Sequence, residues 1–417
     1  MELKKYRLGD IAEIIGGVSY SPKDICTGGI RILRGGNIQN QHIELKTDDV
    51  FLPISYKNNI SQIYVGDTIL VASTGSVDVL GKAATCFQYT EDVQIGAFLR
   101  IIRPKADKYT MLISSALSSD YFKRYIKAQA KGTSINNITL GYLRDFEIYA
   151  PHDFTGLSHL SANIENKICL NRAINDNLEA MAKQLYDYWF VQFDFPNEEG
   201  KPYKSSGGAM VYNEKLKREI PQGWTAAKIK DVAQTYSGGT PTSTNSEYYD
   251  GGNIPWINSG ELNNSIITST TNYITEEGLK NSSAKLYPQD TILVALYGAT
   301  AGKVSLLSFE ACSNQAVCGV IPPNKIMTTY IRYYLFSLYE HFITLSSGSA
   351  RDNISQETIK NTILPIPQEK ILKEYSDAVA PIISKTIANQ KEMENLTKQR
   401  DELLPLLLNG QASVNSD

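Results

Sequence analysis

The hexapeptide DTILVA stands at residues 67–72 of this chain, and the same six letters return at residues 290–295. An unbroken run of Thr, Ile, Leu and Val of this length is typical of a short strand buried on both faces. One match of this kind can arise by chance, so the neighbouring sequence must decide whether a whole domain is repeated.

Further pairs of segments match in the same order along the chain. They are GDIAEIIGG (9–17) with KDVAQTYSGG (230–239), IRILRGGNI (30–38) with IPWINSGEL (254–262), VQIGAFLRIIRP (93–104) with NQAVCGVIPP (314–323), and KGTSINNITLGYLRDFEIYAP (131–151) with SGSARDNISQETIKNTILPIP (347–367). The offset is 223 residues at the hexapeptide and drifts only between about 216 and 224 elsewhere, as insertions in surface loops would produce. The chain therefore contains two divergent copies of one domain.

Short apolar runs predict the strands of each copy, and the class is mixed α and β. The predicted strands lie at 30–33, 68–72, 98–102 and 146–149, and at 254–257, 292–296, 316–321 and 363–366. Stretches rich in Tyr and Phe predict one helix in each copy, at 113–130 and at 328–346.

A long helical pattern follows each copy, with apolar residues at steps of three and four. The residues expected to pair the two helices are Ile164, Ile168, Leu178, Leu185, Ile383, Ile387, Met393, Leu396 and Leu403. Polar residues that would fix the register of this pairing are Asn171, Asn175, Gln390 and Arg400. Phe195-Pro196 and Asn409-Gly410 are predicted to end the helices, and Pro381 is a candidate break in the second.

The alternative is that each helix packs only on its own domain. We favour mutual pairing, because helices of about 50–60 Å are too long for one domain to cover. The predicted fold class is α+β, with two repeated mixed α/β domains separated by two long antiparallel helices in a pseudo-two-fold arrangement. The expected boundaries are 1–151 for the first domain, 152–196 for the first helix, 197–222 for a linker, 223–367 for the second domain and 368–411 for the second helix.

Composition excludes several classes of protein. The 417 residues are 42% hydrophobic and 20% charged, and no apolar run suits a signal peptide or a membrane span. Five cysteines without CxxC spacing argue against a zinc site or a disulfide framework, and for a reducing cytoplasm.

The charge of each copy is close to balanced. Lys and Arg number 18 against 15 Asp and Glu in residues 1–151, and 9 against 11 in residues 222–367. Since a free-standing duplex binder usually has a basic face, we expect this chain alone to bind DNA weakly.

The loop that follows the second hexapeptide looks at first like a phosphate-binding loop. That motif needs four residues between its first Gly and its Gly-Lys, followed by Ser or Thr for magnesium. Here Gly298 and Gly302 enclose only three residues, and Val304 follows Lys303. The sequence therefore argues against a nucleotide site at this loop.

Motifs for catalysis do not emerge from the rest of the sequence. The four histidines are scattered, and there is no GxSxG, HExxH or repeated Cys/His pair. Asp67 and Asp290 repeat, but each precedes a strand, where a role in a turn is expected. We therefore predict a protein that is not an enzyme and carries no metal or cofactor of its own.

The two copies differ most in their loops. The first has RGGN (34–37) where the second has NSGE (258–261), and STGSVDVLGK (73–82) is replaced by LYGATAGK (296–303). Hydroxyl, Asn, Lys and Arg side chains suit phosphate oxygens and base edges. Ordinary surface turns are the alternative for any single loop, but the matched positions of all these loops favour recognition.

Four segments carry a resemblance to a known family. They are NRAINDNLEAMAKQLYDYWFVQFDFP (171–196), GKPYKSSGGAMVYNEKLKREIPQGW (200–224), GGTPTS (238–243) and NISQETIKNTILPIP (353–367). With the architecture above, they resemble the specificity subunit of type I restriction–modification enzymes over essentially the whole chain.

The resemblance implies that each copy is a target-recognition domain reading one half of an asymmetric split site in double-stranded DNA. The helices would set the spacing and dock two methyltransferase (modification) subunits. Tyr186, Tyr188 and Trp189 are exposed candidates for that contact, and packing against the domains is an equal alternative for them. Those partners would bind S-adenosylmethionine and methylate adenine N6 after flipping the base, and restriction subunits using ATP and magnesium could join them. This chain would determine which DNA sequence is modified, and its partners would carry out the catalysis.

Candidate DNA contacts were chosen by loop position and side-chain type. In the first copy they are Arg34, Asn37, Ser73, Thr74, Lys82, Thr133, Ser134 and Asn136. In the second they are Thr240, Thr242, Ser243, Asn258, Tyr297, Lys303, Ser349 and Arg351. Two other functions stay open: a duplicated β-rich ligand-binding adaptor without DNA specificity, and an enzyme with an unrecognised site.

Overall fold

The computed structural model describes residues 3–39, 41–46, 48–76, 79–88, 92–129, 136–153, 155–298, 300–346 and 354–408. The chain forms two compact units. The first unit holds Met1–Leu170 and Met393–Asp417, and the second holds Asn171–Glu392. Each long helix therefore contributes one part of its length to each unit.

The first unit is built around a four-stranded sheet in the order β2-β11-β7-β9. Its strands are β2 (Ala12–Gly16), β11 (Leu99–Pro104), β7 (Thr68–Val71) and β9 (Ala83–Thr85). A smaller, three-stranded sheet has the order β10 (Val93–Ile95), β3 (Ile30–Leu33) and β6 (Val50–Leu52). Three further pairs of strands are β1 (Leu3–Arg7) with β13 (Glu147–Pro151), β4 (Ile38–Gln39) with β5 (His42–Ile43), and β8 (Ser73–Thr74) with β12 (Asn136–Asn137).

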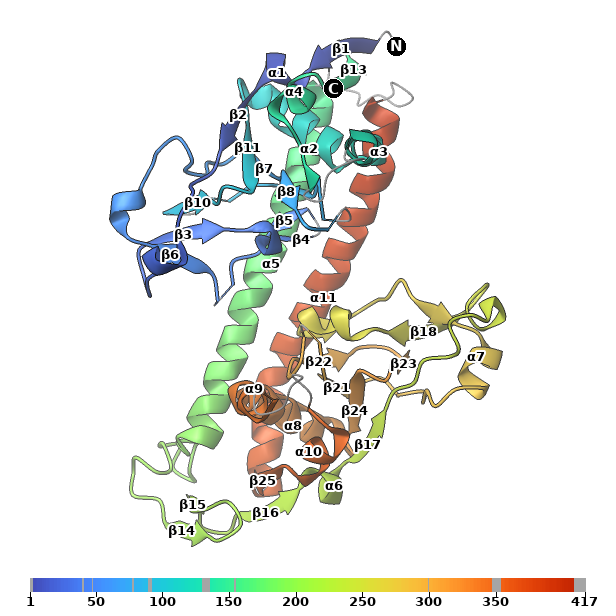
Figure 1. The fold of residues 1–417 in the computed structure, drawn as a ribbon. Coiled ribbons are helices and arrows are strands. Elements are labelled where there is room, and N and C mark those ends of the chain that lie inside the picture. The colour runs from blue at the N-terminus through green and yellow to red at the C-terminus, as the bar shows by residue number, and fades with distance from the viewer. Residues whose placement is uncertain are drawn as a thin grey trace. The chain divides into compact units, whose positions relative to one another are not determined.

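Helices cover one face of this sheet. They are α1 (Leu8–Ile11), α2 (Thr110–Ser118), α3 (Asp120–Gln129) and α4 (Leu140–Arg144), and they share a core with Leu70 (Figure 1). The opposite face carries Ile69 and Val71, which pack with Leu33 and Ile95 of the smaller sheet. The strand β7 is therefore buried on both faces, as its unbroken apolar run predicts.

The second unit has the same plan. Its main sheet has the order β17-β24-β21-β22-β19, with β17 (Gln234–Ser237), β24 (Val317–Ile321), β21 (Ile292–Ala295), β22 (Val304–Leu307) and β19 (Ile266–Ile267). A smaller sheet joins β20 (Tyr273–Ile274), β18 (Ile254–Ile257) and β23 (Cys312–Ser313), and β16 (Thr225–Lys228) pairs with β25 (Ile363–Ile366). The helices are α6 (Ile229–Val232), α7 (Glu276–Lys280), α8 (Lys325–Ser337), α9 (Tyr339–Ser346) and α10 (Gln356–Asn361).

The two units thus repeat one topology, which supports the duplication inferred from the sequence. In both, the middle strand of the smaller sheet pairs parallel to one neighbour and antiparallel to the other. Gly17 and Gly238 also stand in matching places. A Cβ at Gly17 would come within 2.2 Å of the Gly96 carbonyl oxygen, and one at Gly238 within 2.1 Å of the Asn314 carbonyl oxygen. Only glycine allows this close approach, which explains one glycine of each Gly-Gly pair.

The shared hexapeptide, however, is not in structural register. The amide of Gly81 donates to the carbonyl of Val71 at 2.9 Å, and the amide of Gly302 donates to the carbonyl of Ala295 at 2.9 Å. Val71 pairs with Leu99 in the first sheet, and Ala295 holds the matching place in the second. Val71 therefore corresponds to Ala295, 224 positions on and not 223.

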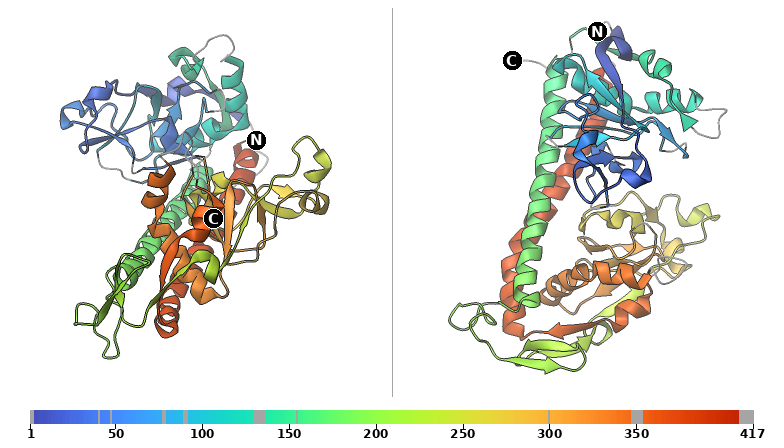
Figure 2. Two further views of the ribbon diagram at one scale, coloured as in Figure 1. Left: turned by 60° about the horizontal axis from the view of Figure 1, so that its bottom comes forward. Right: turned by 60° about the vertical axis from the view of Figure 1, so that its left-hand side comes forward.

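This shift by one residue moves side chains to the opposite face, because strand side chains alternate. Ile69 packs with Val71 on the face away from the helices, whereas Ile292 packs with Val294 in the core that includes residues of α8. Figure 2 shows the same ribbon from two further sides. The prediction that Asp67 and Asp290 are equivalent was therefore wrong. Asp290, with φ of 67°, takes the place of Gly66, with φ of 94°, and both amides donate at 2.8 Å to the neighbouring strand.

The helices predicted at 113–130 and 328–346 are each two helices. The first breaks at Ser119 between α2 and α3, and the second at Leu338 between α8 and α9. The Ser119 hydroxyl accepts from the amide of Phe122 at 3.1 Å, which begins a new helix. Apolar periodicity continues across both breaks, so the pattern alone did not reveal them.

The long helices are α5 (Thr155–Tyr186) and α11 (Glu369–Leu408). A π-helical turn, η5 (Asp187–Val191), continues α5 and brings its end close to Phe195 and Pro196. Pro381 does not break α11. Buried neighbours on the same helix, Tyr375, Val379 and Ile383, give it enough packing to offset the ~3 kcal/mol that proline costs inside a helix.

The predicted linker at 197–222 contains a hairpin of β14 (Met210–Asn213) and β15 (Arg218–Pro221). Its start folds back on the end of the first helix, where the ring of Phe195 stacks between those of Tyr203 and Trp224, with centroids 4.7 Å and 5.4 Å away. These aromatic contacts tie the segment to the core of the second unit.

Candidate nucleic-acid interface

In the second unit, polar loops meet where the strands of the main and smaller sheets end. Thr240 donates a hydrogen bond to the side chain of Gln315, and the neighbouring Asn314 donates to the Asn258 side-chain oxygen at 3.1 Å. Asn258 itself caps the short helix η7 (Ser259–Asn263) through Glu261. Two of the predicted residues, Thr240 and Asn258, are thus joined through one turn.

Lys303 reaches the same group of loops. Its ammonium donates to the Asn263 side-chain oxygen at 2.6 Å, at the far end of η7. Tyr297 is half-buried against the core of the unit, while Thr242 and Ser243 are exposed. The second unit therefore presents hydroxyl, amide and ammonium groups from three separate loops at one edge.

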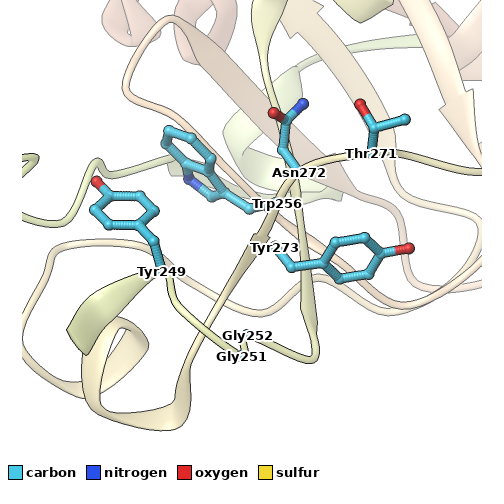
Figure 3. A pocket seen from close by; sticks show the side chains of 7 residues that line it. All are labelled: Tyr249, Gly251, Gly252, Trp256, Thr271, Asn272 and Tyr273. Atoms are coloured by element: carbon cyan, nitrogen blue, oxygen red, sulfur yellow. The ribbon is translucent and has the colours of Figure 1, made fainter. Parts of the chain in front are cut away.

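Beside these loops lies a pocket of about 340 Å³. It is lined by Tyr249, Gly251, Gly252, Trp256, Thr271, Asn272 and Tyr273 (Figure 3). The rings of Tyr249 and Trp256 meet edge to face, with centroids 6.1 Å apart, which is a favourable aromatic geometry.

In the first unit, Asn37 and Arg34 have different roles. Asn37 is only 2% exposed, accepts from the amide of Arg34 at 2.8 Å, and donates to Asp49 at 2.5 Å and to the Glu44 carbonyl at 2.9 Å. Its side chain is therefore committed to shaping the loop and is not available to DNA. Arg34 is exposed, with one long contact of 3.5 Å to the Asp48 carbonyl.

The other first-unit candidates lie at the end of β7. Ser73 and Thr74 are half-buried in β8, which pairs with Asn136 and Asn137 of β12. Lys82 is exposed, one residue after the positive-φ Gly81. Thr133, Ser134, Ser349 and Arg351 lie outside the described residues, as does the side chain of Asn136.

Sequence reasoning missed Gln315 and Asn263. Both are polar residues beside predicted ones, and Gln315 is exposed at the turn before β24. Gln315 stands at the start of the segment NQAVCGVIPP, whose apolar pattern predicts a strand and does not indicate a polar contact. Their position in a loop matched between the copies is the signal that could have identified them.

Comparison with known proteins identifies the family. The family model described as "Type I restriction modification DNA specificity domain" matches residues 1–180 and 221–398. The chain belongs to this family. The match falls once on each repeat and includes most of both long helices.

Curated specificity subunits are similar over most of this specificity-domain chain. It is 25% identical to the type I restriction enzyme MjaIX specificity subunit of Methanocaldococcus jannaschii, covering 98% of this chain and 93% of the relative. It is 27% identical to the HindI specificity subunit of Haemophilus influenzae, covering 72% and 76%. The crystal structure of an S subunit from M. genitalium has the same fold, with a TM-score of 0.53 at 14% identity, over 99% of this chain and 97% of that one.

In this family member the long helices pair within each unit. In the first unit Ile164, Ile168 and Met393 form a buried cluster, against which Leu396 packs. Next to it the Arg400 guanidinium donates to Glu165 at 2.8 Å. Leu403, also predicted to pair, is exposed.

In the second unit the pairing is polar as well as apolar. Asn171 donates to Glu392 at 2.8 Å, and Asn389 donates to the Asn175 side-chain oxygen at 2.9 Å. The Asn175 amide in turn donates to the Thr386 carbonyl at 3.3 Å. Gln390 is half-buried, whereas its neighbour Asn389 is fully buried and makes the contact to Asn175.

The apolar residues predicted for this part of the helices lie at different depths. Ile383 is buried in the core of the second unit, Leu185 and Ile387 pack partly buried against it, and Leu178 is half-buried.

Two aromatic residues expected on the helix surface are buried. Tyr186 and Trp189 lie in the core of the second unit with Phe190 and Tyr375, so for them the alternative of packing against the domain holds and the expected exposure does not. The π-turn accounts for Trp189, because it adds a residue to the turn and rotates the ring inward. Tyr188 is exposed, as predicted.

Among the described residues, no three or more His, Cys, Asp and Glu side chains gather in a way that could hold a metal ion. Within the same ranges, none of the helices has the length and apolar character needed to cross a membrane.

Proposed function

We propose that this chain is the DNA-recognition subunit of a type I restriction–modification complex, and that each repeated domain reads one half of an asymmetric split site. One observation carries this proposal: the two units share a framework but present different polar groups at the same sheet edge. Exposed Arg34 in the first unit stands where the second unit has Asn258. Different side chains on one framework give different half-sites, because base edges are read by side chains and not by the fold.

The long helices would set the distance between the half-sites. Contacts of Asn171 with Glu392 and of Asn175 with Asn389 support an antiparallel pairing, since numbers rise along α5 as they fall along α11. With 32 residues in α5 and 40 in α11, the helices span about 48 Å and 60 Å at 1.5 Å per residue. Such a length can hold two readers about one helical turn of DNA, roughly 34–36 Å, apart in a pseudo-two-fold molecule.

The same helices would dock two modification subunits. Large apolar side chains stay exposed on and just after α5: Met181, Tyr188 and Val191. The hairpin that follows exposes Val211 and Tyr212. Exposed apolar groups of this kind suit a protein interface.

Catalysis would lie on the partners. Modification subunits would bind S-adenosylmethionine and methylate adenine N6 in the cytoplasm, and restriction subunits using ATP and magnesium could join the complex. The recognition domains of this chain carry charges of only +3 in residues 1–151 and −2 in residues 222–367. The partners would therefore supply most phosphate contacts. The family match does not support the ligand-binding adaptor.

Methylation mapping tests the proposal. DNA from cells that express this chain with its modification partner is compared with DNA from cells that lack this chain. We expect N6-methyladenine in an asymmetric split motif, and exchange of residues 223–367 for another recognition domain should change one half of that motif only. An assembled complex that gives no sequence-dependent methylation would refute the assignment.

A further inference from the structure

Three of the side chains that line the pocket of the second unit donate hydrogen bonds to residues outside it, in the loops that carry Thr240 and Asn258. The Trp256 indole N–H donates to the Gly239 carbonyl at 2.9 Å, and the Tyr249 hydroxyl donates to the Pro241 carbonyl at 2.6 Å. Asn272 donates from its amide to the Glu261 carboxylate at 3.2 Å. Figure 3 shows Tyr249 and Trp256 side by side, with the Tyr273 ring turned away from them.

These bonds hold the backbone on both sides of Thr240. Gly239 and Pro241 flank Thr240, so the two aromatic donors fix the carbonyls immediately before and after it. A Cβ at Gly239 would come within 2.2 Å of the Ala284 amide nitrogen, so the loop is also held by close contact on its other side. Thr240 therefore has little freedom to shift.

Asn272 serves the second loop. The Glu261 carboxylate that receives its hydrogen bond also accepts from the amide of Asn258 at 2.8 Å, which begins η7. The backbone of Asn272 is fixed in turn, because its carbonyl accepts from the Trp256 amide at 2.9 Å. One connected group of pocket side chains thus reaches both Thr240 and Asn258.

The first unit has a similar polar arm, in which Asn37 accepts from the Arg34 amide and donates to Asp49, but at the position of Trp256 it has no indole donor. Trp256 pairs with Cys312 of β23, and the matching place in the first unit, opposite Gln94 of β10, is held by Ile32. Ile32 has no side-chain donor and is fully buried in an apolar cluster. We therefore expect the effect of the Trp256 donor in the second recognition domain only.

We propose that Trp256, Tyr249 and Asn272 are positioning residues that set the specificity of the second half-site by fixing the loops of Thr240 and Asn258. This inference rests on the proposed function. Recognition of a base edge requires its partner to be placed within a fraction of an ångström, and a displaced loop loses that discrimination.

The test uses the full chain assembled with its modification subunits. Tyr249→Phe removes only the hydroxyl donor, whereas Trp256→Phe keeps an aromatic ring but removes both the N–H donor and the second ring of the indole. Tyr273→Phe is the matched control, because it removes a hydroxyl from the same pocket that bonds to nothing among the described residues. Methylation rates are measured on DNA with the correct site and on DNA with one mismatch in either half.

We expect Trp256→Phe and Tyr249→Phe to reduce discrimination against mismatches in the second half-site by about 3- to 10-fold, from the loss of one hydrogen bond. Discrimination in the first half-site, and both halves for Tyr273→Phe, should stay within about twofold of the unaltered chain. A thermal unfolding curve for each variant checks that the fold persists, and Asn272→Ala should act on the same half.

Unchanged discrimination in both aromatic variants would overturn this inference while leaving the proposed function intact. Equal loss in both halves would also overturn it, because it would show a general effect on the fold. If the unaltered complex methylates no split motif, the proposed function itself fails, and the two failures are distinguished.

Discussion

The Arg400 guanidinium lies 2.8 Å from the Glu165 carboxylate, and this pair joins the two long helices inside the first unit. Both residues are nearly buried, with 6% and 7% of their surface exposed. Burial opposes the charge on Arg400, but the attraction of Glu165 and Asp401 outweighs it and holds the pKa of Arg400 above its usual value. An ion pair therefore joins the helices here, and each of its two charges is stabilised by the other.

Removing one partner of this pair should be costly. Arg400→Ala leaves Glu165 buried and unpaired, so we expect the free energy of unfolding to fall by about 3–5 kcal/mol, measured by urea denaturation. The double variant Arg400→Met with Glu165→Leu should recover most of that loss. Lys398→Ala, which removes an exposed pair with Glu402, is the control and should stay within about 0.5 kcal/mol. Equal losses in the single and double variants would contradict the expected coupling.

Arg34 and Asn37 should separate recognition from stability. Asn37→Ala removes the donor to one oxygen of the buried Asp49, whose other oxygen keeps Arg31 and the Lys46 amide, and should destabilise the first unit by about 1–3 kcal/mol in thermal or urea unfolding. Arg34→Ala should leave stability within about 0.5 kcal/mol and weaken selection at the first half-site by about 1–3 kcal/mol. The opposite outcome, with Arg34→Ala unfolding the domain and Asn37→Ala altering only selection, would refute this division.

Lys82 is expected to contact phosphate and not bases. Lys82→Ala in the assembled complex should weaken binding about equally for matched and mismatched DNA, because a phosphate contact carries no sequence information. The slope of the logarithm of affinity against the logarithm of salt concentration should fall by about 0.9. Lys82→Arg is the control and should keep that slope. A loss confined to matched DNA would assign Lys82 to base reading instead.

Alkaline pH should unfold the second unit. Burial raises the pKa of Tyr287, Tyr333 and Tyr334 to about 12 each, above the ordinary value near 10. The folded state therefore holds these protons more tightly, so their stabilising effect is complete below pH 10 and is lost as pH rises toward 12. Ultraviolet absorbance of tyrosinate should then rise together with loss of helical circular dichroism, and Tyr287→Phe should weaken the pH dependence. Ionisation of these tyrosines well before unfolding would contradict the prediction.

The sequence predicted the repeat, the main strands and the long helices, because each rests on a pattern that extends over many residues. Alternation and helical periodicity follow burial directly, and both copies bury the same faces. The prediction was less accurate where a single local contact determines where a helix ends or which way a side chain points. The breaks at Ser119 and Leu338 and the inward turn of Trp189 come from caps and a π-turn, which leave the apolar pattern almost unchanged.

The candidate site was predicted at the level of loops but not of side chains. Thr240, Asn258 and Lys303 lie in neighbouring loops that hydrogen bonds join, and their contact with DNA stays a prediction. Asn37 looks the same in sequence as an exposed asparagine, yet Asp49 and Glu44 hold it inside the domain. Which of two polar side chains faces solvent depends on partners distant in sequence, and a single sequence does not show those partners.

The displaced hexapeptide has a practical consequence for anyone who builds hybrids of the two copies. Letter identity aligns Ile69 with Ile292, so a junction placed by it would join Ile69 directly to Leu293. Every later side chain of the strand would then be turned to the wrong face. A junction from Ile69 directly to Val294 keeps each side chain on its own face, because Ile69 and Leu293 occupy the same place. The identical hexapeptides are therefore a misleading guide to the junction. The correct junction lies one residue further along the second copy.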